Sequence, residues 1–159
     1  MNAIAWKEIK LLVLDFDGVL TDGFVYVDQD GRETVRCSHR DGMGVELIAQ
    51  KGVKTIVISK QKNKVVEARC RKMAIECHYG IDDKFTLLKK LLGEMGVDAR
   101  HVCYVGDDVN DVECLRYAGI GVTVTDGAKA AKDAADHVTH ARGGEHAVRE
   151  VCDLICGTT

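Results

Sequence analysis

Short apolar runs alternate with amphipathic stretches along the whole chain, and this alternation limits the possible folds more than any other feature. The apolar runs are LLVLD (11–15), VKTIVIS (53–59), the weaker IECHYG (75–80), HVCYVGD (101–107) and GIGVTV (119–124). Helix-like stretches lie near 42–51, 62–73, 83–95, 109–117, 127–134 and 145–156. Repeated strand and helix predict a parallel sheet between helices, so we expect a Rossmann-like doubly wound α/β fold.

One segment interrupts the alternation. Residues 23–37, GFVYVDQDGRETVRC, contain two extended stretches around Asp30-Gly31, a dipeptide typical of tight hairpin turns. We therefore expect a β-hairpin that stands off the sheet just after the first strand. The chain of 159 residues shows no repeat, low-complexity tract or linker, so we predict a single domain over residues 1–159.

Composition argues against several classes of protein. The net charge is −3 and 30% of the residues are charged, so neither nucleic acid nor a membrane is favoured as a partner. The start, MNAIAWKEIK, lacks the long apolar run of an export signal or a membrane span. The 7 cysteines include no C-x-x-C pair and fit neither a zinc ribbon nor a disulfide framework. We expect free thiols and a cytoplasmic protein.

Polar side chains follow most of the predicted strands. In chain order these are the acid pair Asp15 and Asp17, then Ser59 with Lys60, then Lys84, then the acid pair Asp107 and Asp108. Because ligands bind at the carboxyl ends of parallel strands, we expect all of them to converge on one crevice. Burying two carboxylates behind an apolar strand is costly, so a bound cation, a reaction or both must hold them there.

These residue types suit the hydrolysis of a phosphate ester. Asp15 would attack phosphorus and form an aspartyl-phosphate, which divides one difficult hydrolysis into two easier steps. Asp17 would protonate the leaving alkoxide and then take a proton from the attacking water. Ser59 and Lys84 would hold the phosphoryl oxygens by hydrogen bond and charge.

The acidic crevice also predicts a Mg²⁺ ion, a hard cation that prefers carboxylates and water. We predict Asp15, Asp17 and Asp107 as its ligands. Asp111, four residues after Asp107, would begin the next helix and orient its neighbours. Asp108 is interpreted as hydrogen-bonding the start of that helix rather than touching the metal.

The order DFDGV, strand-ending Ser, Lys and GDDxxD resembles the four motifs of the haloacid dehalogenase superfamily of phosphohydrolases. The double aspartate in the first motif is the pattern of its phosphatases, whereas the transport ATPases of the superfamily have Thr at the second position and the dehalogenases lack that acid. The resemblance covers the whole chain and implies a Mg²⁺-dependent phosphatase with a haloacid dehalogenase-like fold.

A finer resemblance follows from the short spacings between the motifs, which leave no room for a cap domain. The chain is similar to the capless 3-deoxy-D-manno-octulosonate 8-phosphate phosphatases in DGVLTDG (17–23), the hairpin, RDGMG (40–44) and RGGEHAVREVCDLI (142–155). That family packs four subunits through their hairpins, and each tail helps to close a neighbour's site. The resemblance implies a homotetramer with Arg142, Gly143 and Gly144 near a partner's pocket.

The segment after the second strand departs from this family. The octulosonate phosphatases tend to have Thr-Gly-Arg where this chain has Ser59-Lys60-Gln61. Residues 58–84 look closer to the phosphatase domains associated with acylneuraminate cytidylyltransferases, which act in nine-carbon sialic or nonulosonic acid pathways. We therefore expect an eight- or nine-carbon 2-keto-3-deoxy sugar acid phosphate as the substrate.

Some of these residues have simpler interpretations when taken alone. Ser59 is typical of a helix N-cap and Lys84 of an exposed lysine, and only their place in the series favours a role in the site. Lys60 would either lie on a solvated helix face or contact the substrate. Arg40 would either contact a substrate carboxylate across a subunit boundary or lie at the surface near a helix start.

His137 and His140 have the spacing of a helical metal pair, but they lie in a strand-to-loop region, so we do not predict zinc there. Two other functions remain as alternatives to the enzyme. A phosphoacceptor receiver domain is disfavoured by the order of its residues. Receivers place the acid pair first and the acceptor Asp later, followed by the hydroxyl and then the lysine, whereas in this chain a second acid pair ends the series. A catalytically silent, tetramer-forming module associated with an acylneuraminate cytidylyltransferase is disfavoured because every predicted catalytic residue is present.

Overall fold

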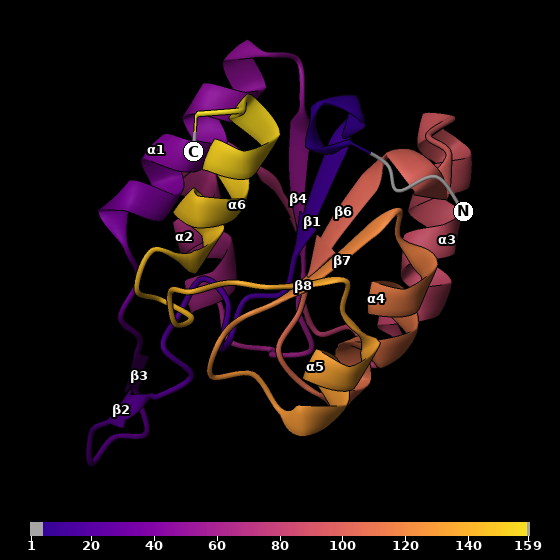
Figure 1. Cartoon of the computed structure of the whole chain (residues 1–159). Coiled ribbons are helices and arrows are strands. Elements are labelled where there is room, and N and C mark those ends of the chain that lie inside the picture. Colours follow the sequence, from indigo (N-terminus) through magenta and orange to yellow (C-terminus); the bar gives the residue numbers. More distant parts are fainter. Residues whose placement is uncertain (1–4, 159) are drawn as a thin grey trace.

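The computed structural model describes residues 5–158. Residues 1–4, part of the start in which no export signal is predicted, and residue 159 lie outside the described residues. A six-stranded parallel sheet forms its centre, in the order β5-β4-β1-β6-β7-β8 (Figure 1). The strands are β1 (Leu11–Leu14), β4 (Lys54–Ile58), β5 (Glu76–His78), β6 (Val102–Val105), β7 (Ile120–Thr123) and β8 (His137–Val138). The predicted α/β class is confirmed.

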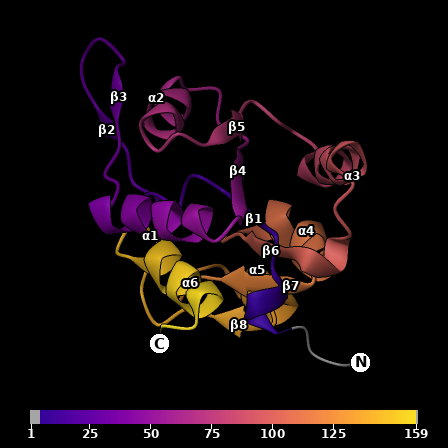
Figure 2. The ribbon, with the colours of Figure 1, turned by 90° about the horizontal axis from the view of Figure 1, so that it is seen from above.

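Helices cover both faces of this sheet (Figure 2). One face carries α1 (His39–Gln50), α2 (Val65–Lys72) and α6 (Ala147–Cys156), and the other carries α3 (Lys84–Met95), α4 (Val112–Tyr117) and α5 (Lys129–Ala134). Short 3₁₀ turns lie at Trp6–Glu8, Ala99–His101 and Val109–Asp111. No helix of the described residues is long and apolar enough to cross a membrane.

Strand β1 shows why the apolar runs become central strands. Leu12 and Leu14 pack in the core under α1, α2 and α6, whereas Leu11 and Val13 pack in the core under α3, α4 and α5. Each of these four side chains is at most 1% exposed. A strand that is buried on both faces has no solvent side, which explains the continuous apolar run in place of an alternating one.

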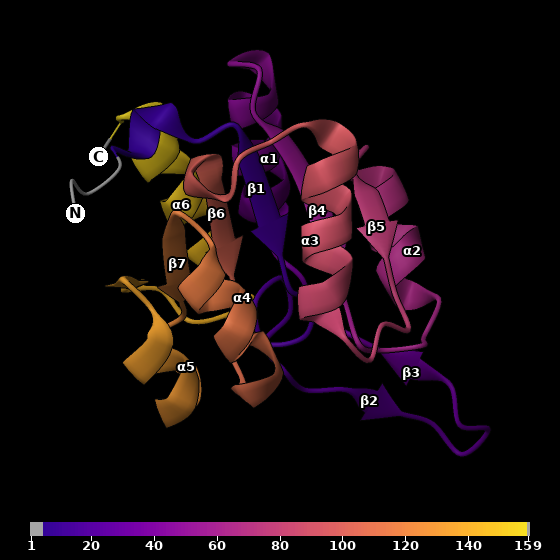
Figure 3. The ribbon, with the colours of Figure 1, turned by 90° about the vertical axis from the view of Figure 1, so that its right-hand side faces the viewer.

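The predicted hairpin is also present. Strands β2 (Tyr26–Val27) and β3 (Glu33–Thr34) pair antiparallel, and Gly31 takes the left-handed conformation (φ +76°) in the turn between them. An isolated bridge between Thr21 and Cys37 closes its base. Figure 3 shows the hairpin projecting from the end of the domain at which β1 and β4 finish, away from the sheet.

Two element boundaries differ from the sequence prediction. Helix α1 begins at His39, earlier than the expected residue 42, because the Ser38 hydroxyl accepts a hydrogen bond from the Arg40 backbone N–H and caps it. Strand β8 (His137–Val138) falls in the expected strand-to-loop region, but two residues are too short to carry a periodic pattern, so its place in the sheet was not predicted. Its pairing with β7 adds an edge strand to the sheet.

Candidate active site

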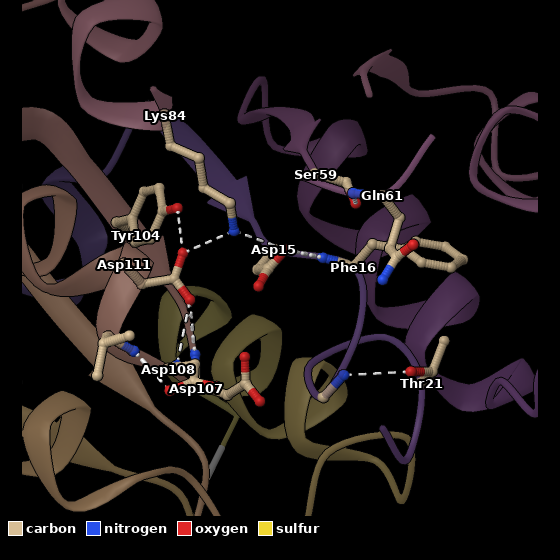
Figure 4. Close-up of polar contacts among 12 residues, drawn as sticks. Asp15, Phe16, Thr21, Ser59, Gln61, Lys84, Tyr104, Asp107, Asp108 and Asp111 are labelled. Atoms are coloured by element: carbon tan, nitrogen blue, oxygen red, sulfur yellow. Dashed lines mark hydrogen bonds and ion pairs between the residues drawn. The ribbon is translucent and has the colours of Figure 1, made fainter. Parts of the chain in front are cut away.

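A lysine and two carboxylates meet at the carboxyl end of the sheet, where Asp15 follows β1, Asp111 lies in the turn after β6, and Lys84 begins α3 (Figure 4). The Lys84 ammonium Nζ lies 2.8 Å from Asp15 Oδ1 and 2.9 Å from Asp111 Oδ1. The side chains of Lys84 and Asp111 are 0% exposed and that of Asp15 is 8% exposed. Lys84 is the first residue of α3, so the start of that helix places the ammonium above the end of β1.

Asp15 presents its two carboxylate oxygens differently. Oδ1 accepts hydrogen bonds from Lys84 Nζ and from the Phe16 backbone N–H at 2.6 Å. Both of these donors reach Oδ1, and among the described residues no hydrogen bond or ion pair falls on Oδ2, which leaves Oδ2 for a ligand. The Asp15 backbone N–H donates to the Val105 carbonyl, so the main chain of β6 fixes the residue from behind.

Asp111 holds the loop that carries the second acid pair. Its Oδ2 accepts from the backbone N–H groups of Asp107 at 3.0 Å and Asp108 at 3.3 Å. Its Oδ1 accepts from the Tyr104 hydroxyl at 2.7 Å as well as from Lys84. The Asp108 carboxylate accepts from the Val109 N–H at the start of the 3₁₀ turn before α4, and Asp108 is exposed.

The Asp107 side chain lies against the turn after β1 at Gly18, the residue with no side chain. A Cβ atom on Gly18 would lie 1.9 Å from Asp107 Oδ2, so no side chain fits there, and Gly18 also has a left-handed backbone (φ +79°). The Gly18 and Gly23 N–H groups both donate to the buried Thr21 hydroxyl, which fixes the turn after β1. Asp17 lies in this turn, and its Oδ2 is buried without a hydrogen-bond partner among the described residues.

The predicted residues line one open crevice of about 630 Å³. Ser59 is buried at the end of β4, and its hydroxyl accepts from the Gln61 N–H, so it caps the loop after the strand. It is not the N-cap of α2, which begins six residues later at Val65. The lining comprises Asp15, Asp17, Gly18, Gly23, Ser59, Lys60, Gln61, Lys62, Asp82, Lys84, Asp107, Asp108 and Asn110. A larger, mainly apolar hollow between α1 and α2 contains none of the predicted residues.

Burial and crowding shift the ionisation of this site. Burial and the neighbouring Asp111 raise the pKa of Asp15 well above its usual range, against the opposite effect of Lys84. Burial, together with Asp111 and Asp108, raises the pKa of Asp107 to about 7. Burial also raises the pKa of Asp17. For Lys84, burial would lower the pKa, but the charges of Asp15 and Asp111 outweigh it and raise the pKa. The crevice thus holds more negative charge than Lys84 neutralises.

Carboxylate oxygens of Asp15, Asp107 and Asp111 lie within 4.8 Å of one another, close enough to surround one cation. All-oxygen ligands suit a hard divalent ion, and such an ion would relieve the excess negative charge. Asp111 already receives donors on both oxygens, so Asp15 and Asp107 are the better ligands. The side chain of Asp17, the third predicted ligand, is not part of this group.

The predicted substrate contacts are distributed differently. Lys60 lines the crevice. Arg40 instead lines a neighbouring hollow of about 580 Å³ between the hairpin base and the start of α6. Arg142 is exposed and lies 3.5 Å from Asp126, and the next two glycines pack against the turn after β1 of the same chain. Only Lys60 of the three therefore reaches this chain's own crevice.

The sequence analysis did not predict Tyr104 and Thr21. The Tyr104 hydroxyl donates to Asp111, and the Thr21 hydroxyl accepts from two backbone N–H groups in the turn after β1. Tyr104 lies within a continuous apolar strand, so its hydroxyl gave no pattern to recognise. A polar Thr21 within the DGVLTDG turn was a visible signal, because a buried hydroxyl needs partners. His137 and His140 both lie near Glu150 Oε1, at 3.9 and 3.1 Å, and are not gathered with a third ligand in the part of the chain that the structure describes.

Comparison with known proteins agrees with this geometry. Residues 71–151 match the family of haloacid dehalogenase-like hydrolases. The 3-deoxy-D-manno-octulosonate 8-phosphate phosphatase KdsC of Salmonella typhi is 37% identical over 150 residues, which are 94% of this chain and 80% of that protein.

Solved structures of such phosphatases have the same fold. That of Moraxella catarrhalis, in complex with a magnesium ion, a phosphate ion and a KDO molecule, superposes with a TM-score of 0.93 at 35% identity, over 97% of this chain and 89% of that one. The cobalt-bound form of the Haemophilus influenzae phosphatase has a TM-score of 0.91 at 31% identity, over 96% and 90% of the two chains.

Proposed function

This chain belongs to the haloacid dehalogenase-like hydrolases, and we propose that it is a Mg²⁺-dependent phosphomonoesterase for an eight- or nine-carbon 2-keto-3-deoxy sugar acid phosphate. The observation that carries the proposal is the Lys84 ammonium between Asp15 and Asp111, with Asp107 and Ser59 on the same crevice. Relatives over nearly the whole chain are named as octulosonate 8-phosphate phosphatases, which supports this substrate class.

In this proposal Asp15 Oδ2 attacks phosphorus. The new bond joins Oδ2 to phosphorus, and the bond between phosphorus and the sugar oxygen breaks. Asp17 donates its proton to that leaving oxygen; its raised pKa suits a group that must carry a proton before the step. A water oxygen then bonds to phosphorus while Asp17 takes a proton from that water, and the bond between Asp15 Oδ2 and phosphorus breaks, which releases inorganic phosphate and restores the Asp15 carboxylate.

The other crevice residues hold charge in place. Lys84 and Ser59 would bind the phosphoryl oxygens, and the fixed ammonium needs no reorganisation when charge develops on them. Asp15 and Asp107 would hold Mg²⁺, which when bound would neutralise the charge between carboxylate and phosphate. A part for Asp17 in metal binding stays a prediction. Lys60, at the rim, would attract the carboxylate of a sugar acid.

We also propose that the protein is a homotetramer assembled through its hairpins. Two observations support this. The hairpin carries four exposed apolar residues in a row, Phe24, Val25, Tyr26 and Val27, at 48–70% exposure. No cap domain covers the crevice among residues 5–158, and an open site discriminates poorly among small substrates. In such an assembly, Arg40 and Arg142 would reach a neighbour's crevice.

The test is phosphate release with Mg²⁺ from a panel of octulosonate 8-phosphate, nine-carbon deaminated and N-acetylated 9-phosphates, and simple hexose phosphates. We expect a sugar acid phosphate to be preferred, with octulosonate 8-phosphate and the nonulosonates separating the two substrate lengths. Equal rates on hexose phosphates would contradict the substrate class. No release from any ester, by folded protein with Mg²⁺, would favour the silent assembly module.

A further inference from the structure

We propose that Tyr104 is a positioning residue for phosphoryl transfer: its hydroxyl fixes Asp111, and through Asp111 it fixes the Lys84 ammonium beside Asp15. The inference rests on the proposed function, because it concerns the same reaction centre. Tyr104 is in β6, and its side chain is completely buried beneath the crevice (Figure 4). It would touch neither substrate nor metal, so its effect would pass through Asp111.

Each oxygen of the Asp111 carboxylate receives two donors. Oδ1 accepts from the Tyr104 hydroxyl at 2.7 Å and from Lys84 Nζ at 2.9 Å. Oδ2 accepts from the N–H groups of Asp107 and Asp108. An ionised carboxylate has about four acceptor positions, so these donors fill it. Rotation of the group would break at least one of these bonds, which makes Asp111 a fixed anchor in the 0%-exposed interior.

The ammonium of Lys84 is divided between two acceptors at nearly equal distances, Asp15 at 2.8 Å and Asp111 at 2.9 Å. An ammonium has three donors, so the third is left for a phosphoryl oxygen. Tyr104 and Lys84 share the same oxygen of Asp111. Without the Tyr104 hydroxyl, Oδ1 would have Lys84 as its only donor among the described residues, and the ammonium would move toward Asp111 and away from Asp15.

The hydroxyl, rather than the ring, is what this position requires. The ring packs in the apolar cluster under α3, α4 and α5, where phenylalanine would fill nearly the same volume. A buried hydroxyl is unfavourable unless it is hydrogen-bonded, and here its partner is a charged group. Burial and the nearby Asp111 raise the pKa of Tyr104 well above its usual range, so the hydroxyl keeps its proton and acts as the donor.

The experiment is steady-state kinetics of Tyr104→Phe on the preferred ester. We expect kcat to fall about tenfold with KM changed less than about twofold, since a lost hydrogen bond to a charged group is felt mainly where charge develops. Thr55→Val is the matched control: Thr55 is a buried strand hydroxyl on β4 whose oxygen has no partner among the described residues. An unchanged kcat in Tyr104→Phe, or an equal fall in Thr55→Val, would overturn the proposal.

Two further measurements separate positioning from general loosening. The first is inhibition: vanadate mimics the transition state, and inorganic phosphate is the product. Tyr104→Phe should raise the inhibition constant of vanadate about tenfold and that of phosphate less than about twofold. Equal increases in the two constants would count against positioning. If the wild-type protein released phosphate from no ester, the proposed function would fail, and the crystal structure of Tyr104→Phe would decide this inference alone. Movement of Lys84 Nζ away from Asp15 would support it, and unchanged distances would overturn it.

Discussion

The crevice and the hairpin depart from the usual division of polar and apolar residues in opposite directions. In the crevice, Lys84 and Asp111 are charged and 0% exposed. In the hairpin, Phe24 and Tyr26 are apolar and 70% and 67% exposed. Single exposed apolar residues are common on protein surfaces, but buried charges and contiguous exposed apolar residues usually have a functional reason.

The difference lies in where each region finds its partner. The buried charges are matched within the chain, since Lys84 bridges two carboxylates and Asp111 receives four donors. The hairpin has few such contacts: it is a short two-stranded pair held at its base by the bridge between Thr21 and Cys37 and by Arg36, which lies 2.8 Å from both Asp22 and Glu145. An isolated hairpin is marginally stable in water, and in the proposed tetramer its apolar strands would find their partner in another subunit.

The largest expected effect comes from removing the central charge of the crevice. Lys84→Met leaves Asp15 and Asp111 buried without their counter-charge, so the free energy of unfolding at neutral pH should fall by about 3–5 kcal/mol and activity should be lost. Urea unfolding followed by circular dichroism measures the first. Lys60→Met, at the exposed rim, is the control and should change stability by less than about 0.5 kcal/mol. Equal stabilities for the two variants would show that the charges are not matched as described.

The next effect concerns the hairpin and is one of assembly. Replacing Phe24 and Tyr26 together by serine should convert the proposed tetramer into monomers, because it removes the apolar surface that the subunits would share. Sedimentation velocity across a wide concentration range measures the mass. Val138→Ser alters an exposed apolar residue on the edge strand β8, 39% exposed, and should leave the assembly intact. If the wild-type protein sediments as a monomer at every concentration, the proposal that the hairpins join the subunits is wrong.

A buried carboxylate outside the crevice, that of Asp41, sharpens the comparison. It forms no ion pair with any described residue, and the nearby His146 and Arg69 only partly offset the effect of burial on its pKa. Asp41 in α1 is 0% exposed; its Oδ1 accepts from the Arg149 N–H at the start of α6, and its Oδ2 has no partner among the described residues. Burial raises the pKa of Asp41 from 3.8 to about 6. The folded chain therefore binds this proton more tightly than the unfolded chain, and stability falls as pH rises from about 4 to about 6.

Asp41→Asn removes that proton exchange. The stability of the variant relative to wild type should rise by on the order of 2 kcal/mol between about pH 4 and pH 7, and then stay constant. Thermal unfolding at a series of pH values measures it, and the crevice carboxyls titrate in both proteins and cancel. Asp30→Asn, in the exposed turn of the hairpin, should show no comparable trend. A flat difference for Asp41→Asn would mean that this carboxyl is not penalised by burial.

The two regions also differ in how far the sequence predicts them. The acid pairs, Ser59 and Lys84 follow apolar strands in register, so the rule that strand ends converge was enough to place them together. The hairpin was visible through Asp30-Gly31 and its flanking extended stretches. Tyr104 could not be predicted from the sequence. Its hydroxyl donates a hydrogen bond to Asp111, and only the packing of β6 against the turn that follows it creates this contact.

Other misses have the same physical cause. Asp41 looks like an ordinary acid in the first turn of a helix, and only the packing of α1 against α6 buries it. Arg40 lies in a separate hollow because residues 36–40 and 144–146, far apart in the chain, come together there, and no local pattern encodes that contact. Short-range patterns thus predicted the strand ends and the turn, whereas contacts between distant helices required the structure.

The most direct test of the central claim is the rate of phosphate release from octulosonate 8-phosphate with Mg²⁺, measured side by side for wild type and Asp15→Asn. Asparagine keeps the acceptor oxygen that faces Lys84 and the Phe16 N–H but cannot attack phosphorus. We expect release by wild type and a rate at least about 1,000-fold lower in the folded variant, as for loss of a nucleophile in other enzymes. Release by Asp15→Asn within about tenfold of wild type would contradict the account, because the reaction would then not pass through this carboxylate.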